Sequence, residues 1–355
     1  MRISLIQPAE LRGAEFMAWH DMQRATSSLM NPFLCPEFAI GAGKFRPGSR
    51  LAVLTEGPEI LGFLPFERRR FGVGMPIGAG LSNCQGLVHV PGLNWEAREV
   101  LRGCRVSAWQ FDNLAQGQAP FERYAAAQVA VGAINLADGF DAYCEKLKIT
   151  SARFLKDLSR RTRSLEREFG EIRLVCDSPD TAALRMVMGW KSGQCRRNAW
   201  QDIFDRRWVV ELVDYLFTCR SDLFSSSLSV LYAGKTPVAG QFGLRCGGYF
   251  AGWFTAFDES FRSYSPGLIQ VMRLAEHLAD AGVEVIDMGG GAHYQDKLKN
   301  HDLYFTKGMV TSGPVTGALH RPRIASAAWA RRRIRQCPPV YRAAGYVLRR
   351  SGRIA

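Results

Sequence analysis

The spacing of apolar residues in the first third of the chain predicts a mixture of strands and helices. Short alternating or continuous apolar runs are typical of strands, and apolar residues three and four apart are typical of one helix face. On this basis we expect strands at Arg2–Gln7, Leu51–Thr55, Ile60–Phe66 and Val106–Phe111, and helices at Pro8–Leu29 and Trp95–Gly103. The glycine- and asparagine-rich stretch Met75–Leu87 is expected to be a loop.

The same kinds of element return after a break near Leu114–Pro120. We expect helices at Asp141–Lys148, at Thr150–Phe169 and over most of Asp180–Cys219. We expect strands at Gln128–Leu136, Glu171–Cys176, Leu228–Ala233, Val238–Leu244, Tyr249–Phe257 and Val283–Met288. The second half therefore repeats the first in outline, and a length of 355 residues also favours two domains.

The helix predicted over Ser265–Ala281, between two of these strands, is the most informative segment. Ser265 is a favourable N-cap, Pro266 suits the first helical position, and Gly282 ends the helix. No acidic residue occurs in the first two turns, so free N–H groups and the helix dipole would attract an anion. The candidate residues for binding a phosphate-bearing cofactor are Arg262, Ser263, Tyr264, Ser265, Gly267 and Leu268. A Ser-Pro pair also begins helices that bind nothing, and both interpretations stay open.

The segment Gly234-Lys235-Thr236 invites comparison with a nucleotide-binding P-loop. That loop requires a glycine at position 229, where the chain has Ser229, and a helix after the threonine. Here Pro237 leads into a strand instead. We therefore exclude a P-loop and interpret the segment as a hairpin turn.

Cysteine usage and hydropathy narrow the class of protein. The nine cysteines are odd in number and form no Cys-x-x-Cys pair, which argues against a zinc site and a disulfide framework. No metal is expected. The longest weakly polar runs, Tyr124–Ala137 and Gly247–Phe257, are shorter than the roughly 18 residues of a membrane span. The segment after Met1 also lacks the apolar stretch of a signal peptide, so we expect a cytoplasmic protein.

The formal net charge of +13 is concentrated near the C-terminal end. From Leu303 onward the chain has no acidic residue, yet it holds Lys307 and ten arginines. The run Arg331–Arg335, flanked by aromatic and aliphatic residues, suits an anionic membrane surface, and would then place the protein at the inner face of the membrane. The same run suits a phosphate-rich partner such as a cyclic dinucleotide or tRNA. A solvated tail without a partner is the alternative interpretation.

Element order and several local strings resemble the GNAT superfamily of N-acyltransferases, in particular its tandem-domain branch. That branch includes Fem-type peptidoglycan aminoacyltransferases and acyltransferases associated with cellulose and exopolysaccharide synthesis. The matching strings are Asn31-Pro32-Phe33, Pro36-Glu37-Phe38, Leu64-Pro65-Phe66, Arg160–Arg163, Trp190–Gln194, Tyr264–Gly267 and Ile286–Gly289. The resemblance covers roughly residues 1–317.

The fold that this resemblance implies is α/β, with α+β mixed sheets, in two tandem GNAT-like domains of the Fem-type arrangement. An N-terminal GNAT-like domain would occupy residues 1–120. A C-terminal GNAT domain carrying the acyl-donor site would occupy residues 121–317, and a basic, arginine-rich tail would follow at 318–355.

The resemblance also implies acyl transfer from an acyl-CoA, with acetyl-CoA the first expectation. The acceptor would be an amino sugar or polysaccharide precursor in exopolysaccharide or cell-envelope biosynthesis. The pantetheine arm would lie along the strand Tyr249–Phe257, and the pyrophosphate would rest at the start of the helix Ser265–Ala281. Strand-end N–H groups would stabilise the oxyanion.

Acyl transfer to an amine requires a base with a pKa near the working pH. Asp287, at a strand end, and His293 are the candidates for this base. A phenol such as Tyr264 or Tyr294 could protonate the departing thiolate. A simpler interpretation makes Asp287 the cap of a turn and His293 an exposed loop residue.

Lys297 is a further catalytic candidate, because the family usually has a Tyr-Lys pair after the glycine turn. Here Gln295 and Asp296 separate Tyr294 from Lys297, and Ala292 replaces the usual acidic residue. This departure from the family pattern puts a catalytic role for Lys297 in doubt. The lysine is equally interpreted as part of a solvated helix face.

Acceptor-binding candidates lie on a different helix. Lys191, Gln194 and Arg197 recur three residues apart after Trp190 and could share one acceptor-facing side. Trp253, on the long strand, is the fourth candidate for this side. A surface helix without a ligand is the simpler interpretation of the three polar residues.

Two other functions stay open from the sequence. The first is a Fem-type transferase that takes its acyl group from an aminoacyl-tRNA, which a basic tail would suit. The second is a catalytically decayed effector that binds a cyclic dinucleotide and regulates polysaccharide production, which the altered Tyr-Lys segment would suit.

Overall fold

The computed structural model describes residues 1–78, 80–289 and 295–313 of the chain. The strands in these ranges are β1 (Arg2–Ile6), β2 (Ser49–Glu56), β3 (Glu59–Arg68), β4 (Val73–Pro76), β5 (Val88–His89), β6 (Ala108–Leu114), β7 (Ala125–Asn135), β8 (Ile172–Val175), β9 (Phe224–Ala233), β10 (Thr236–Cys246), β11 (Tyr249–Phe257), β12 (Val285–Asp287) and β13 (His301–Thr311). They form one mixed sheet in the order β1-β2-β3-β4-β6-β13-β7-β12-β11-β10-β9-β8, and β5 pairs with β3 off this path.

The α-helices of the described residues lie between these strands. They are α1 (Gly13–Arg24), α2 (Pro36–Phe45), α3 (Ala97–Gly103), α4 (Ala119–Glu122), α5 (Gly139–Phe169), α6 (Thr181–Arg197), α7 (Arg207–Thr218), α8 (Pro266–Asp280) and α9 (Gln295–Leu298). Mixed sheet and helices together confirm the α/β class expected from the sequence.

The sheet contains the same strand arrangement twice. In the N-terminal half, β1, β2, β3 and β4 pair antiparallel in turn, and β4 then pairs parallel with β6. In the C-terminal half, β8, β9, β10 and β11 pair antiparallel in turn, and β11 then pairs parallel with β12. Two helices separate the first two strands of each set, α1 and α2 in one and α6 and α7 in the other. The outline repeat expected from the sequence is therefore present.

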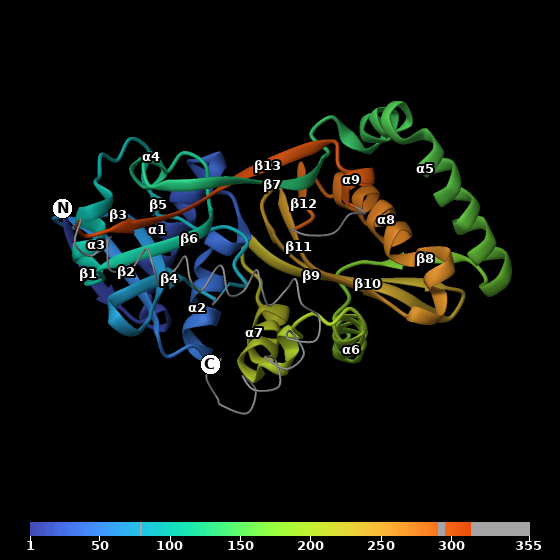
Figure 1. The fold of residues 1–355 in the computed structure, drawn as a ribbon, viewed down its shortest axis with the longest axis horizontal. Coiled ribbons are helices and arrows are strands. Elements are labelled where there is room, and N and C mark those ends of the chain that lie inside the picture. The colour runs from blue at the N-terminus through green and yellow to red at the C-terminus, as the bar shows by residue number, and fades with distance from the viewer. Residues whose placement is uncertain (79, 290–294, 314–355) are drawn as a thin grey trace.

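Two long strands join the halves at the centre of the sheet. β13 pairs antiparallel with β6 on one side and with β7 on the other, and β7 also pairs antiparallel with β12. The C-terminal strand β13 therefore completes the sheet of the N-terminal half, as the ribbon crossing the molecule in Figure 1 shows. A single cut in the chain cannot divide the two halves into separate domains, because the pairing of β13 with β6 would cross the cut.

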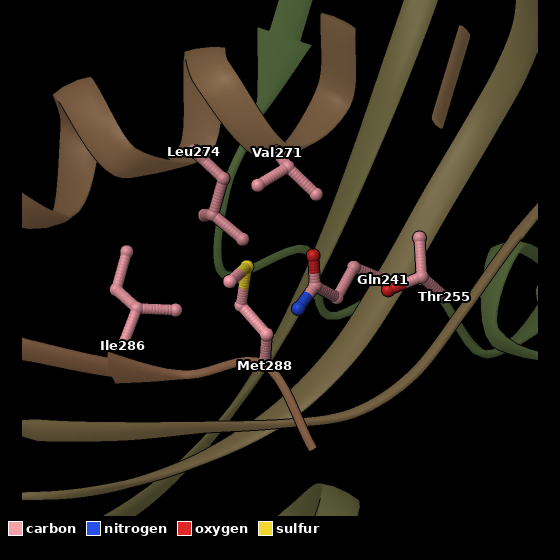
Figure 2. A pocket seen from close by; sticks show the side chains of 6 residues that line it. All are labelled: Gln241, Thr255, Val271, Leu274, Ile286 and Met288. Atoms are coloured by element: carbon pink, nitrogen blue, oxygen red, sulfur yellow. The ribbon is translucent and has the colours of Figure 1, made fainter. Parts of the chain in front are cut away.

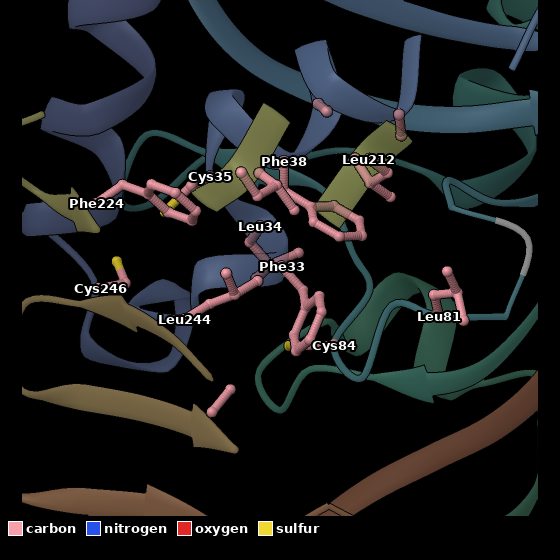
Figure 3. Close-up of a cluster of buried hydrophobic side chains, with 14 of the residues drawn as sticks. Phe33, Leu34, Cys35, Phe38, Leu81, Cys84, Leu212, Phe224, Leu244 and Cys246 are labelled. Atoms are coloured by element: carbon pink, nitrogen blue, oxygen red, sulfur yellow. The ribbon is translucent and has the colours of Figure 1, made fainter. Parts of the chain in front are cut away.

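Helices cover the two faces of the C-terminal sheet separately. The apolar stripe of α8, which includes Leu274, Ala275 and Leu278, packs with α5 on one face. The helices α6 and α7 cover the other face. There the core is continuous with that of the N-terminal half, because Phe33, Phe38 and Leu81 pack in the same cluster as Phe224 and Leu244 (Figure 3).

Three expected elements differ in detail from the structure. The helix expected over Pro8–Leu29 is broken: α1 ends at Arg24 and short 3-10 turns flank it. The two helices expected between Asp141 and Phe169 are one helix, α5, with a kink at Ser151, whose φ of −143° is not helical. The loop expected at Met75–Leu87 begins with the end of β4. None of the described helices is both long and apolar enough to cross a membrane.

Candidate functional site

β11 and β12 run side by side only where they begin. Their parallel pairing extends from Tyr249 opposite Val285 to Ala251 opposite Asp287. Beyond Ala251, no strand in the described residues pairs with this edge of β11, whereas its other edge stays paired with β10 up to Phe257. An open strand edge offers N–H and C=O groups to an extended polar molecule.

A β-bulge lies at the start of this open edge. Phe254 pairs with Phe242 and Gly252 pairs with Gly243, so Trp253 is the extra residue in β11. A bulge bends its strand and increases the local twist, which is consistent with the divergence of β11 from β12 at this point. The open edge therefore begins where the strand bends.

Asp287 lies at the closed end of the divergence. Its side chain is only 1% exposed, its Oδ2 accepts a hydrogen bond from the Tyr249 hydroxyl at 3.1 Å, and its Oδ1 accepts one from the Gly289 N–H at 2.7 Å. Burial raises the pKa of Asp287 to about 6, and the two hydrogen bonds oppose that rise. A carboxyl group with this pKa is ionised at neutral pH and still binds a proton readily, as a general base must.

The Asp287 carboxylate faces the N-terminal half of the protein. Burial raises the pKa of the Cys84 thiol, and the charge of Asp287 adds to that rise, so the two side chains are near neighbours. Burial also raises the pKa of the Tyr249 phenol well above its ordinary value, which keeps the hydroxyl protonated and donating. The base candidate is thus located where the two halves meet.

The start of α8 lies at the open end of the divergence, but its geometry corrects the expectation for Ser265. Ser265 has left-handed backbone angles (φ 57°, ψ 50°), and its side chain does not cap the helix. Its N–H donates to the carbonyl oxygen of Arg262 at 3.1 Å, and the Leu268 N–H donates to the Ser265 carbonyl oxygen at 2.9 Å. The N–H of Gly267, between them in the chain, has no hydrogen-bond partner among the described residues. Of the residues expected to bind an anion, Gly267 is therefore the one whose N–H is available to do so.

Helix α5 holds the loop before α8 in place. The Arg161 guanidinium donates to the Ser263 carbonyl oxygen at 3.0 Å and to the Ser265 Oγ at 2.8 Å. The Tyr264 hydroxyl donates to the carboxylate of Glu168, and this hydrogen bond raises the pKa of Tyr264. Tyr264 thus lies with α5, and the described residues show no contact between Tyr264 and Asp287.

The cation expected to assist an anion at this loop is already paired. Arg262 donates to Glu259 at 2.7 Å, and Arg197 of α6 lies 2.7 Å from the other oxygen of the same carboxylate. Glu259 therefore links the end of α6 to the loop of 3-10 helix η6 (Glu259–Tyr264). Two arginines on one half-buried carboxylate leave an excess positive charge beside the start of α8.

The acceptor candidates do not act as one group. The Lys191 ammonium donates to Gln194 Oε1 at 3.1 Å and to the Thr255 carbonyl oxygen of β11 at 3.5 Å. Burial lowers the pKa of Lys191. Lys191 and Gln194 thus lie together against the strand, whereas Arg197 is held by Glu259.

Trp253 belongs to an aromatic cluster between the two halves. Its indole N–H donates to the Leu81 carbonyl oxygen at 3.2 Å, and its ring contacts those of Phe33, Phe38 and Phe242. The bulged residue is therefore anchored on the N-terminal half. Trp253 would contact the acceptor, as expected from the sequence, from this position.

The remaining catalytic candidates are not brought to Asp287 in the described residues. His293 and Tyr294 lie outside the described ranges. Lys297, on α9, is exposed and lies 5.8 Å from the ring centre of Phe154 in α5. This position favours the interpretation of Lys297 as a surface residue, in line with its departure from the family pattern.

Three residues of the site were not expected from the sequence. Tyr249 reaches Asp287 only through the parallel register of β11 and β12. Nothing in the local sequence distinguishes Arg161, which reaches the loop before α8, from Arg160, whose only hydrogen bond among the described residues is to Asp157. Gln241, on the neighbouring strand β10, lies opposite Thr255 and lines a small cavity beside the open edge (Figure 2).

Comparisons with known proteins agree with this geometry. Residues 152–298, which include β11, α8 and β12, match the acetyltransferase (GNAT) domain family. FemX has a similar structure, with a TM-score of 0.53 at 11% identity over 87% of this chain and 96% of FemX. At this identity the likeness concerns the fold alone.

Two further solved structures are similar at lower TM-scores. The C-terminal domain of a putative lysylphosphatidylglycerol synthetase from Agrobacterium fabrum has a TM-score of 0.49 and 14% identity, covering 84% of this chain and 93% of that one. A tandem GNAT protein from the clavulanic acid biosynthesis pathway has a TM-score of 0.46 and 13% identity, covering 88% and 99%. No curated protein sequence matches the chain. Residues 152–298 of the chain therefore form an acetyltransferase (GNAT) domain.

Proposed function

We propose that this protein transfers an acyl group, in the first place acetyl, from an acyl-CoA to an amine of an amino-sugar or polysaccharide precursor of the cell envelope. One observation carries the proposal. The divergence of β11 from β12 has a buried carboxyl group at its closed end and the start of α8 at its open end. A thioester laid along β11 would reach both.

The residues at this divergence fit an acyl-CoA. The partnerless Gly267 N–H and the dipole of α8, which has no acidic residue in its first turn, suit the pyrophosphate. The open edge from Gly252 to Phe257 is about 17 Å long at the rise of a β-strand and suits the pantetheine arm. The thioester supplies an activated acyl carbon when it is bound.

The chain's own groups would then handle the proton and the charge. Asp287, with a pKa of about 6, accepts the proton that the acceptor amine loses. Backbone N–H groups of the open edge near the Trp253 bulge donate to the thioester oxygen. Lys191, held at the Thr255 carbonyl, brings positive charge to the same strand.

A cluster of arginines supports an acceptor that carries phosphate, such as a nucleotide-linked amino sugar. Glu67 is buried, and its Oε2 lies 3.0 Å from Arg46 and 2.8 Å from Arg69. Arg206 lies near both arginines, whose charges lower its pKa in addition to burial, and its Nε has no partner among the described residues. Three guanidinium groups around one carboxylate leave net positive charge, and guanidinium matches phosphate well.

This arginine cluster lies within reach of the donor site. Arg206 follows Phe204 by two residues, and the Phe204 ring packs at 5.1 Å against Phe254, next to the bulge of β11. Arg46 follows the last residue of α2, whose Phe38 contacts Trp253. From Phe38 to Arg46 is about 12 Å at the helical rise. An acceptor could thus place its phosphate at the arginines and its amine near Asp287.

The test measures thiol release from acetyl-CoA with glucosamine, with a nucleotide-linked amino sugar and without acceptor. We expect turnover with the phosphate-bearing acceptor and a KM for that acceptor about tenfold higher in Arg206→Ala. The matched control is Arg207→Ala, since Arg207 is exposed and pairs with Glu211. Equal KM values in both variants would remove the arginine cluster from the acceptor site.

The same assay separates the two other functions. Transfer from an aminoacyl-tRNA by a protein that does not bind CoA would assign the Fem-type donor instead. Absence of transfer from either donor, together with binding of a cyclic dinucleotide that requires residues 318–355, would assign the effector function.

A further inference from the structure

We propose that Gln241 is a positioning residue for the acyl donor, whose side-chain carbonyl oxygen accepts a hydrogen bond from an amide N–H of the pantetheine arm. The inference rests on the proposed function, because it assigns a role at the proposed donor site. It goes further by naming one side chain on β10 that holds the donor from outside the open strand edge.

The side chain of Gln241 projects into a cavity of about 10 Å³ on the α8 face of the sheet. Figure 2 shows its amide in the middle of the other lining side chains, between α8 above and the strands below. These are Thr255, Val271, Leu274, Ile286 and Met288. The cavity is therefore enclosed by apolar groups on α8 and β12.

The carbonyl oxygen of Gln241 has no hydrogen bond in this cavity. Gln241 is 5% exposed, and its Oε1 is buried without a partner among the described residues. The apolar walls from Val271, Leu274 and Ile286 cannot donate a hydrogen bond. Because buried polar atoms are nearly always paired in folded proteins, an unpaired acceptor aimed into a cavity indicates a ligand with a donor group.

Gln241 stands where the edge of β11 becomes free. A Cβ added to Gly252, the first residue of the open edge, would lie 2.4 Å from Gln241 Nε2. The Gln241 amide therefore occupies the space over the strand that a side chain at position 252 would enter. The amide lies beside the residue from which a donor arm would begin to follow β11.

The cavity also lies between α8 and β12, the two elements that carry Gly267 and Asp287. Val271, in its wall, follows Gly267 by about one helical turn, and Ile286 and Met288 in the opposite wall flank Asp287. A volume of about 10 Å³ holds roughly one water-sized group, so it suits a single contact and excludes a whole chain. The pantetheine arm offers amide N–H groups of the required kind at this place.

The experiment compares donors with and without amide N–H groups. Calorimetry with CoA is expected to show about tenfold weaker binding to Gln241→Met, which keeps the side-chain length and removes the acceptor. In transfer assays, wild type is expected to prefer S-acetylpantetheine to an S-acetyl alkanethiol of equal length, and Gln241→Met is expected to reduce that preference about tenfold.

The matched control is Gln270→Met. Gln270 on α8 is fully buried and its Oε1 is likewise unpaired, but it does not line the cavity, and its Nε2 donates to Ser229 at 2.8 Å. This variant is expected to bind CoA like wild type, even if its melting temperature falls. Removing the unpaired acceptor at position 241 should leave the melting temperature unchanged or higher.

Three results would overturn the inference. The first is CoA binding by folded Gln241→Met with the affinity of wild type. The second is an equal loss of activity with both donors, which would indicate a structural role for Gln241. The third is wild type that binds no CoA and releases no thiol, in which case the proposed function itself fails and the inference falls with it.

Discussion

Asp287 is held where both of its protonation states are accessible near neutral pH. Burial favours the neutral carboxylic acid, while the Tyr249 hydroxyl and the Gly289 N–H favour the carboxylate, and the balance gives a pKa of about 6. A sequence places an aspartate at a strand end but not its partner, since Tyr249 reaches it only through strand pairing. The sequence could therefore predict Asp287 as a candidate base, but it could not predict the hydrogen bond from Tyr249 that lowers the pKa of Asp287.

The proposed role of Asp287 as the base predicts a pH dependence of transfer. Below pH of about 6 Asp287 is protonated and cannot accept a proton, so kcat/KM should fall as pH is lowered through that value. In Tyr249→Phe a hydrogen bond that lowers the pKa is lost, and the midpoint should move to higher pH. Steady-state rates between pH 5 and pH 9 measure both. Identical pH profiles for wild type and Tyr249→Phe would contradict the effect of the Tyr249 hydrogen bond on the pKa of Asp287.

Asp287→Asn directly tests the proposed role of Asp287 as the base. We expect kcat to fall by about 10²- to 10⁴-fold, the usual contribution of a general base. Folding should not suffer at pH 7, because the pKa of Asp287 is raised in the folded state. The stability that this raised pKa provides is present below the unfolded value of 3.8 and is lost as pH rises through about 6. A folded Asp287→Asn protein with wild-type kcat would exclude Asp287 as the base.

Helix α5 shows how an element can shape a site without touching it. α5 holds the loop before α8 through Arg161, which donates to Ser263 and Ser265. The amphipathic pattern of both helices predicted where they lie along the chain. It could not predict this contact, because Arg160 and Arg161 are the same residue type and only the direction in which each side chain leaves the helix distinguishes them.

Arg160 and Arg161 also supply a test of the loop before α8. Arg161→Ala should weaken CoA binding about tenfold, because each hydrogen bond that fixes the loop is worth about 1 kcal/mol. Arg160→Ala removes an arginine that pairs with the same Asp157 but does not reach the loop, and should bind CoA normally. Equal effects of both substitutions in calorimetry would show that charge alone matters.

The packing of α2 on α7 predicts a stability change at a single glycine. A Cβ at Gly41 would lie 2.6 Å from the Tyr215 ring and 2.9 Å from Leu212, so Gly41→Ala should cost about 1–3 kcal/mol through overpacking. Gly13 in α1 has no atom within 4 Å of such a Cβ, and Gly13→Ala should be neutral or slightly stabilising. Urea unfolding compares the two, and equal midpoints would contradict the packing.

The whole molecule is one continuous sheet whose halves share strands at the centre. Periodicity predicted most of the strands and helices, and the repeat of their order predicted two similar halves. It did not predict that β13 would pair with β6, about 200 residues earlier in the chain, because strand order depends on contacts distant in sequence. The site depends on this arrangement, since Cys84 and Leu81 of the first half face Asp287 and Trp253 of the second.

This architecture predicts cooperative unfolding. β7 and β13 pair over most of their length, and one apolar cluster extends across both halves. Far-ultraviolet circular dichroism and tryptophan fluorescence should therefore follow a single coincident urea transition. Truncation after residue 300, which removes β13, should abolish folding, whereas truncation after residue 317 should keep it. Two separated transitions in the intact chain would show that the halves fold independently.

The most direct test of the donor site is calorimetric binding of acetyl-CoA to wild type, Gly267→Asp and Gly189→Asp. Both glycines have room for a side chain, and Gly189 is exposed on α6, so the added charge is the same and only its place differs. We expect Gly267→Asp to lose at least tenfold in affinity, since its carboxylate would occupy the proposed site of the pyrophosphate at the start of α8. Gly189→Asp should bind like wild type. Unchanged affinity in a folded Gly267→Asp protein would contradict the placement of the acyl donor at this helix.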